Sequence, residues 1–110
     1  MPVLLSLLLA CGYSTYYPSY SAPDGGGCGV DGPDLASLTV SNRHGAEVEL
    51  YEQDVATCAE AFVGSLLNGE DWVSDVRTGH TWVVRGVDGA VVWTFSVPLG
   101  VGVEHVEVIR

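Results

Sequence analysis

Two runs of strand-forming residues on either side of Asp88-Gly89 constrain the fold of this chain most. Residues 80–87 read HTWVVRGV and residues 90–97 read AVVWTFSV, and valine, threonine, tryptophan and phenylalanine are enriched in β-strands. An Asp-Gly dipeptide between two such runs is typical of a type I′ turn, because both positions accept positive φ. The sequence therefore predicts a β-hairpin here.

The rest of the sequence from Leu35 onward repeats this pattern in shorter form. Apolar residues alternate with polar ones in three further runs, SLTVSN (37–42), EVELYE (47–52) and VEHVEVI (103–109), as in strands with one buried and one wet face. In residues 54–70 helical spacing of apolar residues is interrupted by Gly64 and Asn68-Gly69, so a short helix and an irregular strand both remain open. We expect residues 35–110 to form one all-β sandwich.

The first 34 residues have a different composition. An apolar run, Val3 to Ala10, is too short to span a bilayer as a helix and matches the core of a secretory signal peptide. The residues Leu8-Leu9-Ala10-Cys11 resemble the bacterial lipobox, which implies cleavage after residue 10 and lipidation of Cys11. A diacylglyceryl thioether and an acylated amine would anchor the chain stably. Residues 11–34 are rich in Tyr, Ser, Pro and Gly and are predicted to be a flexible tether.

The chain has three cysteines, at positions 11, 28 and 58. With Cys11 assigned to the lipid, Cys28 and Cys58 can form a disulfide in an oxidising envelope compartment, closing a loop of about thirty residues. The alternative is two unpaired thiols, one in the tether and one buried.

The charge balance and the scatter of reactive groups exclude several functions. Four arginines and no lysine stand against 14 acidic residues, so nucleic acid is not expected as a partner. The histidines at 44, 80 and 105 lie in different predicted elements without a metal or nucleophile motif. No cofactor or metal is predicted, and the chain is expected not to be an enzyme. The one conceivable catalytic pair is Cys58 with His80.

Several spaced elements of the predicted sandwich resemble the β domain of the von Hippel-Lindau tumour suppressor family, including its stand-alone bacterial versions. They span about Leu38 to Val97 and comprise Asn42-Arg43, VELY at 48–51, Leu66 with Gly69, and Gly79-His80-x-Trp82 followed by VVR and Asp-Gly. The resemblance implies a β-sandwich of about seven strands, the class that the alternation predicts separately.

The resemblance also implies a peptide pocket, which the best-known member uses to bind hydroxyproline within a ubiquitin ligase. His80 and Trp82 match two of its walls, and Tyr51 stands where the family has a tryptophan. The pocket tyrosine falls at or beside Val63 and the pocket serine at Val76, so recognition of a hydroxyl group is not expected to carry over. Nothing after the sandwich resembles the helical segment that recruits ligase partners, so ubiquitin-ligase partners are not expected.

Two hypotheses for the function follow. In the first, the protein is a membrane-anchored envelope lipoprotein that presents a binding module for a protein or peptide partner, with Tyr51, His80 and Trp82 partly exposed. In the second, it is a purely structural envelope lipoprotein in which these side chains are buried and satisfied. Strand alternation puts His80 and Trp82 on the same face, which is compatible with either hypothesis.

Overall fold

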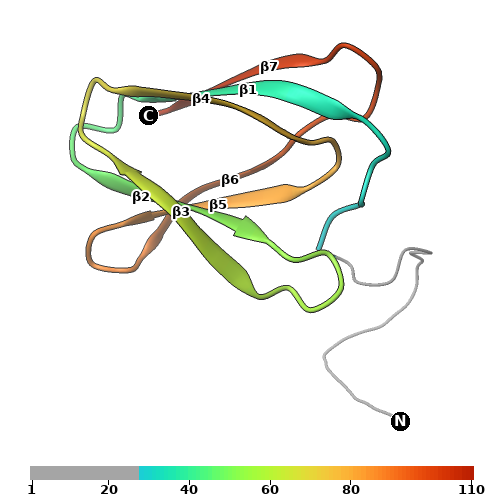
Figure 1. Ribbon diagram of the computed structural model, residues 1–110. Coiled ribbons are helices and arrows are strands. Elements are labelled where there is room, and N and C mark those ends of the chain that lie inside the picture. The colour runs from blue at the N-terminus through green and yellow to red at the C-terminus, as the bar shows by residue number, and fades with distance from the viewer. Residues whose placement is uncertain (1–27) are drawn as a thin grey trace, which may run out of the picture.

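The computed structural model describes residues 28–110, and these residues form seven β-strands in two packed sheets (Figure 1). The strands are β1 (Leu35–Asn42), β2 (Val48–Gln53), β3 (Glu60–Leu66), β4 (Asp71–Arg77), β5 (Thr81–Gly86), β6 (Val91–Ser96) and β7 (Glu104–Ile109). The part of the chain described contains no helix, and therefore no helix that could cross a membrane. The prediction of an all-β sandwich of about seven strands is confirmed.

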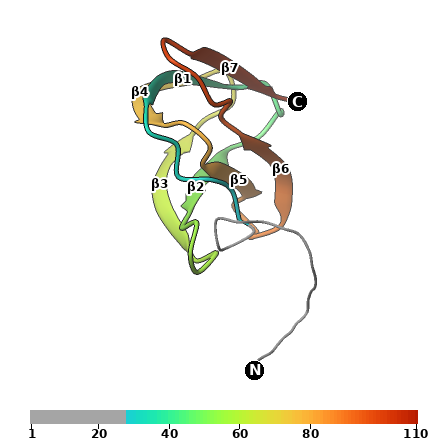
Figure 2. The same ribbon diagram turned by 90° about the vertical axis from the view of Figure 1, so that its right-hand side faces the viewer.

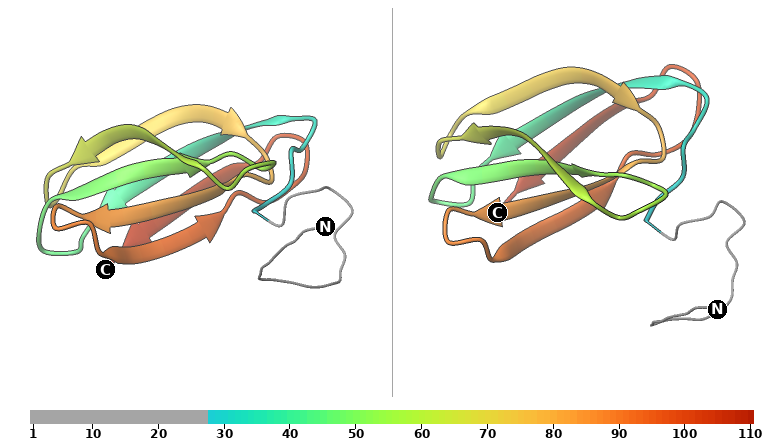
Figure 3. Two further views of the ribbon diagram at one scale, coloured as in Figure 1. Left: turned by 90° about the horizontal axis from the view of Figure 1, so that it is seen from below. Right: turned by 60° about the horizontal axis from the view of Figure 1, so that its bottom comes forward.

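One sheet has three strands in the order β4-β1-β7, and the other has four in the order β3-β2-β5-β6. Neighbouring strands are antiparallel except β1 and β7, which run parallel. Seen from below in Figure 3, the four-stranded sheet has β3 along one edge. β3 and β6 are therefore the edge strands of this sheet.

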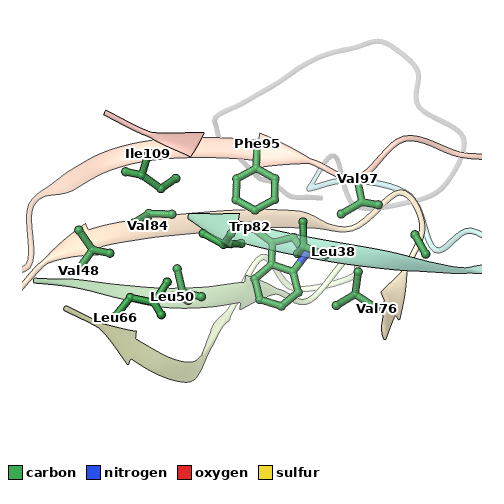
Figure 4. Close-up of a cluster of buried hydrophobic side chains, with 12 residues drawn as sticks. Leu38, Val48, Leu50, Leu66, Val76, Trp82, Val84, Phe95, Val97 and Ile109 are labelled. Atoms are coloured by element: carbon green, nitrogen blue, oxygen red, sulfur yellow. The ribbon is translucent and has the colours of Figure 1, made fainter. Parts of the chain in front are cut away.

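Strand alternation sorts side chains between the core and the surface. In β1 the side chains of Ala36, Leu38 and Val40 are buried, while Ser37 and Thr39 between them are partly exposed. The core contains residues from every strand: Ala36, Leu38, Val40, Val48, Leu50, Leu66, Val76, Trp82, Val84, Phe95, Val97 and Ile109 (Figure 4). Removal of this apolar surface from water is the main force that holds the two sheets together.

The ambiguous segment 54–70 contains a strand, not a helix. β3 pairs with β2, and the register shifts between Leu50 and Tyr51, so that Gly64 lies opposite Leu50 and Phe62 opposite Tyr51. Val63 is therefore the extra residue of a β-bulge. This bulge explains why the apolar residues of the segment do not alternate regularly.

β4, Asp71–Arg77, was not predicted from the sequence. Trp72 packs against the core and Val76 lies in it, while Val73 between them is exposed. Buried and exposed side chains do alternate in this strand, but the four charged residues in it and next to it made the run resemble a loop.

The turn of the predicted hairpin differs from expectation. Gly89 has positive φ, but Asp88 does not, so the two-residue type I′ turn is wrong. The loop instead contains three residues, closed by hydrogen bonds from Gly89 N to Gly86 O and from Gly86 N to Ala90 O, each 2.9 Å. A three-residue loop that ends in a left-handed glycine is the next commonest hairpin connection. The Asp88 carboxylate stabilises it by accepting a hydrogen bond from Ala90 N at 3.0 Å.

Candidate functional site

Residues 28–34, which we call the strap, lie along one end of the sandwich (Figure 2). Val30 N donates to Gly79 O, Gly32 N donates to Thr78 O, both at 2.9 Å, and Thr78 N donates to Asp34 O at 3.1 Å. The prediction that the tether extends to residue 34 is therefore wrong. The folded unit includes the strap, because its backbone groups are paired with the turn between β4 and β5.

The glycines of the strap explain how it approaches this turn so closely. A methyl group on Gly32 would overlap the Thr78 hydroxyl and would lie 2.7 Å from the Thr78 carbonyl oxygen. A methyl group on Gly29, where φ is 107°, would lie 2.8 Å from the carbonyl oxygen of Gly79. Glycine is thus required for contact between the two segments, and Thr78 is completely buried beneath the strap.

A disulfide joins the start of the strap to the loop between β2 and β3. Cys28 and Cys58 are bonded, with their Cα atoms 5.5 Å apart and 30 positions apart in sequence. Cys58 has a φ of 64°, the one positive value for a non-glycine residue among residues 28–110. The strap is thus attached both covalently and by hydrogen bonds.

His80 lies between the strap and strand β2, with a carboxylate on each side of its ring. Nδ1 is 2.7 Å from Glu52 Oε2, and Nε2 is 3.0 Å from Asp31 Oδ1. Because carboxylates only accept hydrogen bonds, the imidazole makes both bonds at once only when both of its nitrogens are protonated. We call this arrangement of His80, Glu52 and Asp31 the histidine clasp. The His80 side chain keeps 19% of its surface exposed.

The electrostatics of the clasp favour the charged imidazolium. Partial burial by itself lowers the pKa of His80, but the hydrogen bonds with Asp31 and Glu52 outweigh it and raise the pKa above its ordinary value. Arg77 pairs with the same carboxylate, with its Nε 3.9 Å from Asp31 Oδ1, and this second cation opposes the charge on His80. The clasp therefore attaches the strap most firmly when His80 is protonated.

Trp82 lies in the core and not at the surface. Its side chain is 2% exposed, stacks on Phe95 with ring centroids 6.3 Å apart, and touches Trp72 at 5.5 Å (Figure 4). The indole Nε1 is buried and has no hydrogen-bond partner among the described residues. Trp82 therefore contributes packing and does not offer a wall to a ligand.

Tyr51 lies on the opposite face of the sheet from His80 and Trp82. Residues that face each other in a sheet point to the same side, and Tyr51 pairs with Val83 whereas Trp82 pairs with Glu52. Tyr51 is on the outer face, where its hydroxyl donates to Glu49 Oε1 at 2.8 Å, and this bond raises the pKa of Tyr51.

The three predicted ligand-binding residues therefore do not line one depression, and the pocket expected from them is wrong. The two positions of the missing pocket groups are also apart. Val76 lies in the core, whereas Val63 is at the bulge of the edge strand β3. Only His80, of the predicted residues, combines partial exposure with charged partners at the end of the sandwich.

An aromatic pair covers part of the outer face of the four-stranded sheet. The rings of Tyr51 and Phe62 meet edge to face with centroids 5.6 Å apart, and Phe62 is 59% exposed. Beside them Arg85 binds Glu60 through two bonds of 3.0 and 2.9 Å. These bonds lower the pKa of Glu60. The surface therefore combines a paired charge with the apolar rings of Tyr51 and Phe62.

The described residues form neither a thiolate–histidine pair nor a cluster of metal ligands at the clasp. Cys58, the conceivable nucleophile, is bonded to Cys28 in this structure, and a disulfide sulfur is not a thiolate. Across residues 28–110, no group of three or more potential protein ligands is arranged to hold a metal ion. The two carboxylates of the clasp bind opposite sides of the imidazole, so both ring nitrogens have protein partners.

Sequence reasoning missed Glu52, Asp31 and Phe62. Glu52 was detectable, because it follows Val48 and Leu50 at the spacing of inward-facing residues and a carboxylate there requires a partner. Asp31 lies 49 positions from His80, and no local pattern indicates that they meet. Phe62 was concealed by the bulge at Val63.

No protein-family model matches the chain, and no curated protein matches it.

Proposed function

We propose that this chain is a non-enzymatic, lipid-anchored protein of the bacterial cell envelope that presents a small β-sandwich as a binding module for a protein or peptide. Cys11, the proposed anchor and membrane partner, and the signal peptide 1–10 lie outside the described residues and are supported by the lipobox-like sequence. The seven-stranded sandwich is compatible with membership of the von Hippel-Lindau β-domain family, which we propose on the motifs around His80. The proposed binding surface differs from that family's pocket.

The observation that carries the binding proposal is the exposed edge strand β3. Its first four residues, Glu60 to Val63, are all exposed, and the outer side of β3 has no neighbouring strand among residues 28–110. Proteins commonly protect such edges with lysines, prolines or charged side chains. Here the one charged residue of β3, Glu60, is paired with Arg85, so the strand offers apolar side chains beside unpaired backbone groups.

An extended peptide is the partner chemistry that fits this surface. A peptide that adds a strand to β3 would satisfy backbone groups along the edge, and its side chains would contact Phe62 and Tyr51 on the outer face. The bulge at Val63 limits regular pairing to the residues on either side of it. We therefore propose a short peptide segment with apolar side chains.

A second candidate is the purely structural lipoprotein. It is favoured by the complete burial of Trp82 and by the two carboxylate partners of His80, which make this part of the molecule a fixed end of the fold. In that case β3 would have no partner, and its exposed residues would be interchangeable.

A comparison of two charge-matched variants separates the candidates. Phe62→Lys places a lysine at the proposed surface, and Val73→Lys places one at a similarly exposed position on β4 of the other sheet. Captures from envelope extract with wild type and both variants are compared by quantitative mass spectrometry. The binding proposal requires a protein that wild type and Val73→Lys retain and Phe62→Lys loses at least tenfold. Identical captures would leave the structural candidate.

The anchor has a separate test. Expression in a bacterium that processes lipoproteins should remove residues 1–10 and add acyl mass to Cys11, as measured on the intact protein. An unmodified Cys11 would contradict the anchor without affecting the proposal for β3.

A further inference from the structure

The loop between β6 and β7 carries an exposed run without any polar side chain. Residues 98–103 read PLGVGV, and Leu99 and Val101 are 58% and 87% exposed. Gly100 and Gly102, on either side of Val101, have φ values of 138° and 69°. Surface loops are normally polar, and apolar side chains gathered at a surface commonly mark a binding site.

This loop meets the strap. A methyl group built on Gly32 or on Gly79 would lie 2.8 or 3.1 Å from Leu99 Cδ2, so Leu99 lies over the contact between the strap and the β4–β5 turn. Val30 of the strap, also exposed, pairs with the same Gly79. Leu99 thus lies against the strap, and we call Leu99 and Val101, two positions apart in the same exposed loop, the apolar tip.

The chain outside the described residues connects to this same end. The strap begins at Cys28, which a disulfide attaches to the sandwich, and Cys11 lies 17 positions earlier. Even a fully extended segment of this length reaches only about 60 Å. A lipid on Cys11 therefore keeps the domain within this distance of the membrane, and the tether joins the domain at the end that carries the apolar tip. The turns at 43–47, 67–70 and 87–90 lie at the opposite end (Figure 1).

The charges near the tip determine which lipids fit. Asp31 and Glu52 are paired with His80 and Arg77, but Asp54 lies at the same end of the sandwich and the exposed Glu104 follows the loop directly. Carboxylates close to a negatively charged lipid surface are repelled. The tip therefore matches zwitterionic phospholipid, where the apolar contact acts without electrostatic attraction.

We propose that the apolar tip docks on the surface of the bilayer that holds the lipid anchor, and so orients the sandwich with β2, β3 and the opposite turns accessible. This inference rests on the proposed anchor at Cys11. Docking inserts Leu99 and Val101 into the interfacial region of zwitterionic phospholipid, and the close contact of Leu99 with Gly32 holds the loop against the strap.

The test uses the full lipidated chain in phosphatidylcholine vesicles with and without brominated acyl chains, which quench nearby tryptophan. Val101→Trp places a probe at the tip, and Val87→Trp places a matched probe at the exposed turn of the opposite end. Wild type supplies the signal of the three native tryptophans for subtraction. Flotation with the vesicles reports the anchor independently of quenching, and urea unfolding shows that each variant is folded.

Docking predicts that brominated lipid reduces the added emission of Val101→Trp at least twofold, while the added emission of Val87→Trp stays unchanged. Leu99→Ser in the Val101→Trp background should weaken the quenching, and so should anionic phosphatidylglycerol. Equal quenching of both probes, or quenching that requires anionic lipid, overturns the docking. If the Val101→Trp chain floats but is not quenched, the anchor stands and the docking is refuted. If the chain does not float, both the anchor and the docking are refuted.

Discussion

The disulfide between Cys28 and Cys58 should supply a large share of the stability of this small domain. Its cysteines are 30 positions apart, and loop-closure entropy for such a loop corresponds to about 3.6 kcal/mol at 25 °C. Domains of this size are commonly stable by only about 5–15 kcal/mol. The double variant Cys28→Ser, Cys58→Ser should therefore unfold far more easily, although its strap retains the hydrogen bonds to Thr78 and Gly79.

Urea unfolding followed by tryptophan fluorescence measures this loss, because Trp82 leaves the core on unfolding. With an m-value of about 1–1.5 kcal/mol/M, the midpoint should fall by about 2.4–3.6 M. The m-value itself should rise, since the unfolded chain without the crosslink exposes more surface. The matched control is wild type under oxidising conditions, with the crosslink verified by intact mass.

The size of the midpoint shift tests whether the disulfide stabilises the domain by restricting the unfolded chain. A fall of less than about 0.5 M, in a double variant with wild-type fluorescence, would show that the crosslink does not restrict the unfolded chain as its loop length requires. A double variant that fails to fold at all would show a larger effect than the entropy of the loop accounts for.

Three further predictions concern the clasp, the core and the strap. Because the pKa of His80 is raised in the folded state, its contribution to stability is complete below about pH 6 and is lost as the pH rises through the folded pKa. The stability difference between wild type and His80→Gln, measured by urea unfolding, should thus shrink from about pH 5.5 to 8.5, and a constant difference would contradict the clasp. Trp82→Ala should lower the free energy of unfolding by about 3–5 kcal/mol, and a loss below 1 kcal/mol would be incompatible with its burial against Phe95. Gly32→Ala should lower the free energy of unfolding by about 1–3 kcal/mol, because the added methyl group overlaps Thr78 and Leu99. Gly64→Ala, which has open space around it, should lower it by less than about 1 kcal/mol in the same measurement.

Most of the strands could be predicted because each carries its own alternation. β1 shows Leu38 and Val40 between polar neighbours, and the same period of two places Val48 and Leu50 of β2 in the core. β3 could not be read in this way, because the bulge at Val63 shifts the period by one residue.

The candidate site was only partly predictable. Strand alternation put His80 and Trp82 on one face. In the structure Trp82 of β5 lies in the core, whereas His80, just before β5, lies at a charged end of the sandwich beside Glu52. Tyr51 fell on the other face, because its neighbour Leu50 points inward. A resemblance in motif spacing does not reveal which face a residue occupies.

The sequence by itself determined the class of fold and the inward face of most strands, since alternation of side chains is a local property of an extended chain. Only the tertiary structure decided what meets at the end of the sandwich. The pairing of β2 with β5 brings Glu52 beside His80, and the strap brings Asp31 to the other side of the ring from 49 positions away. Such contacts depend on sheet register and on the path of the chain across the fold, and these are set by packing of the whole core and not by any local stretch of residues.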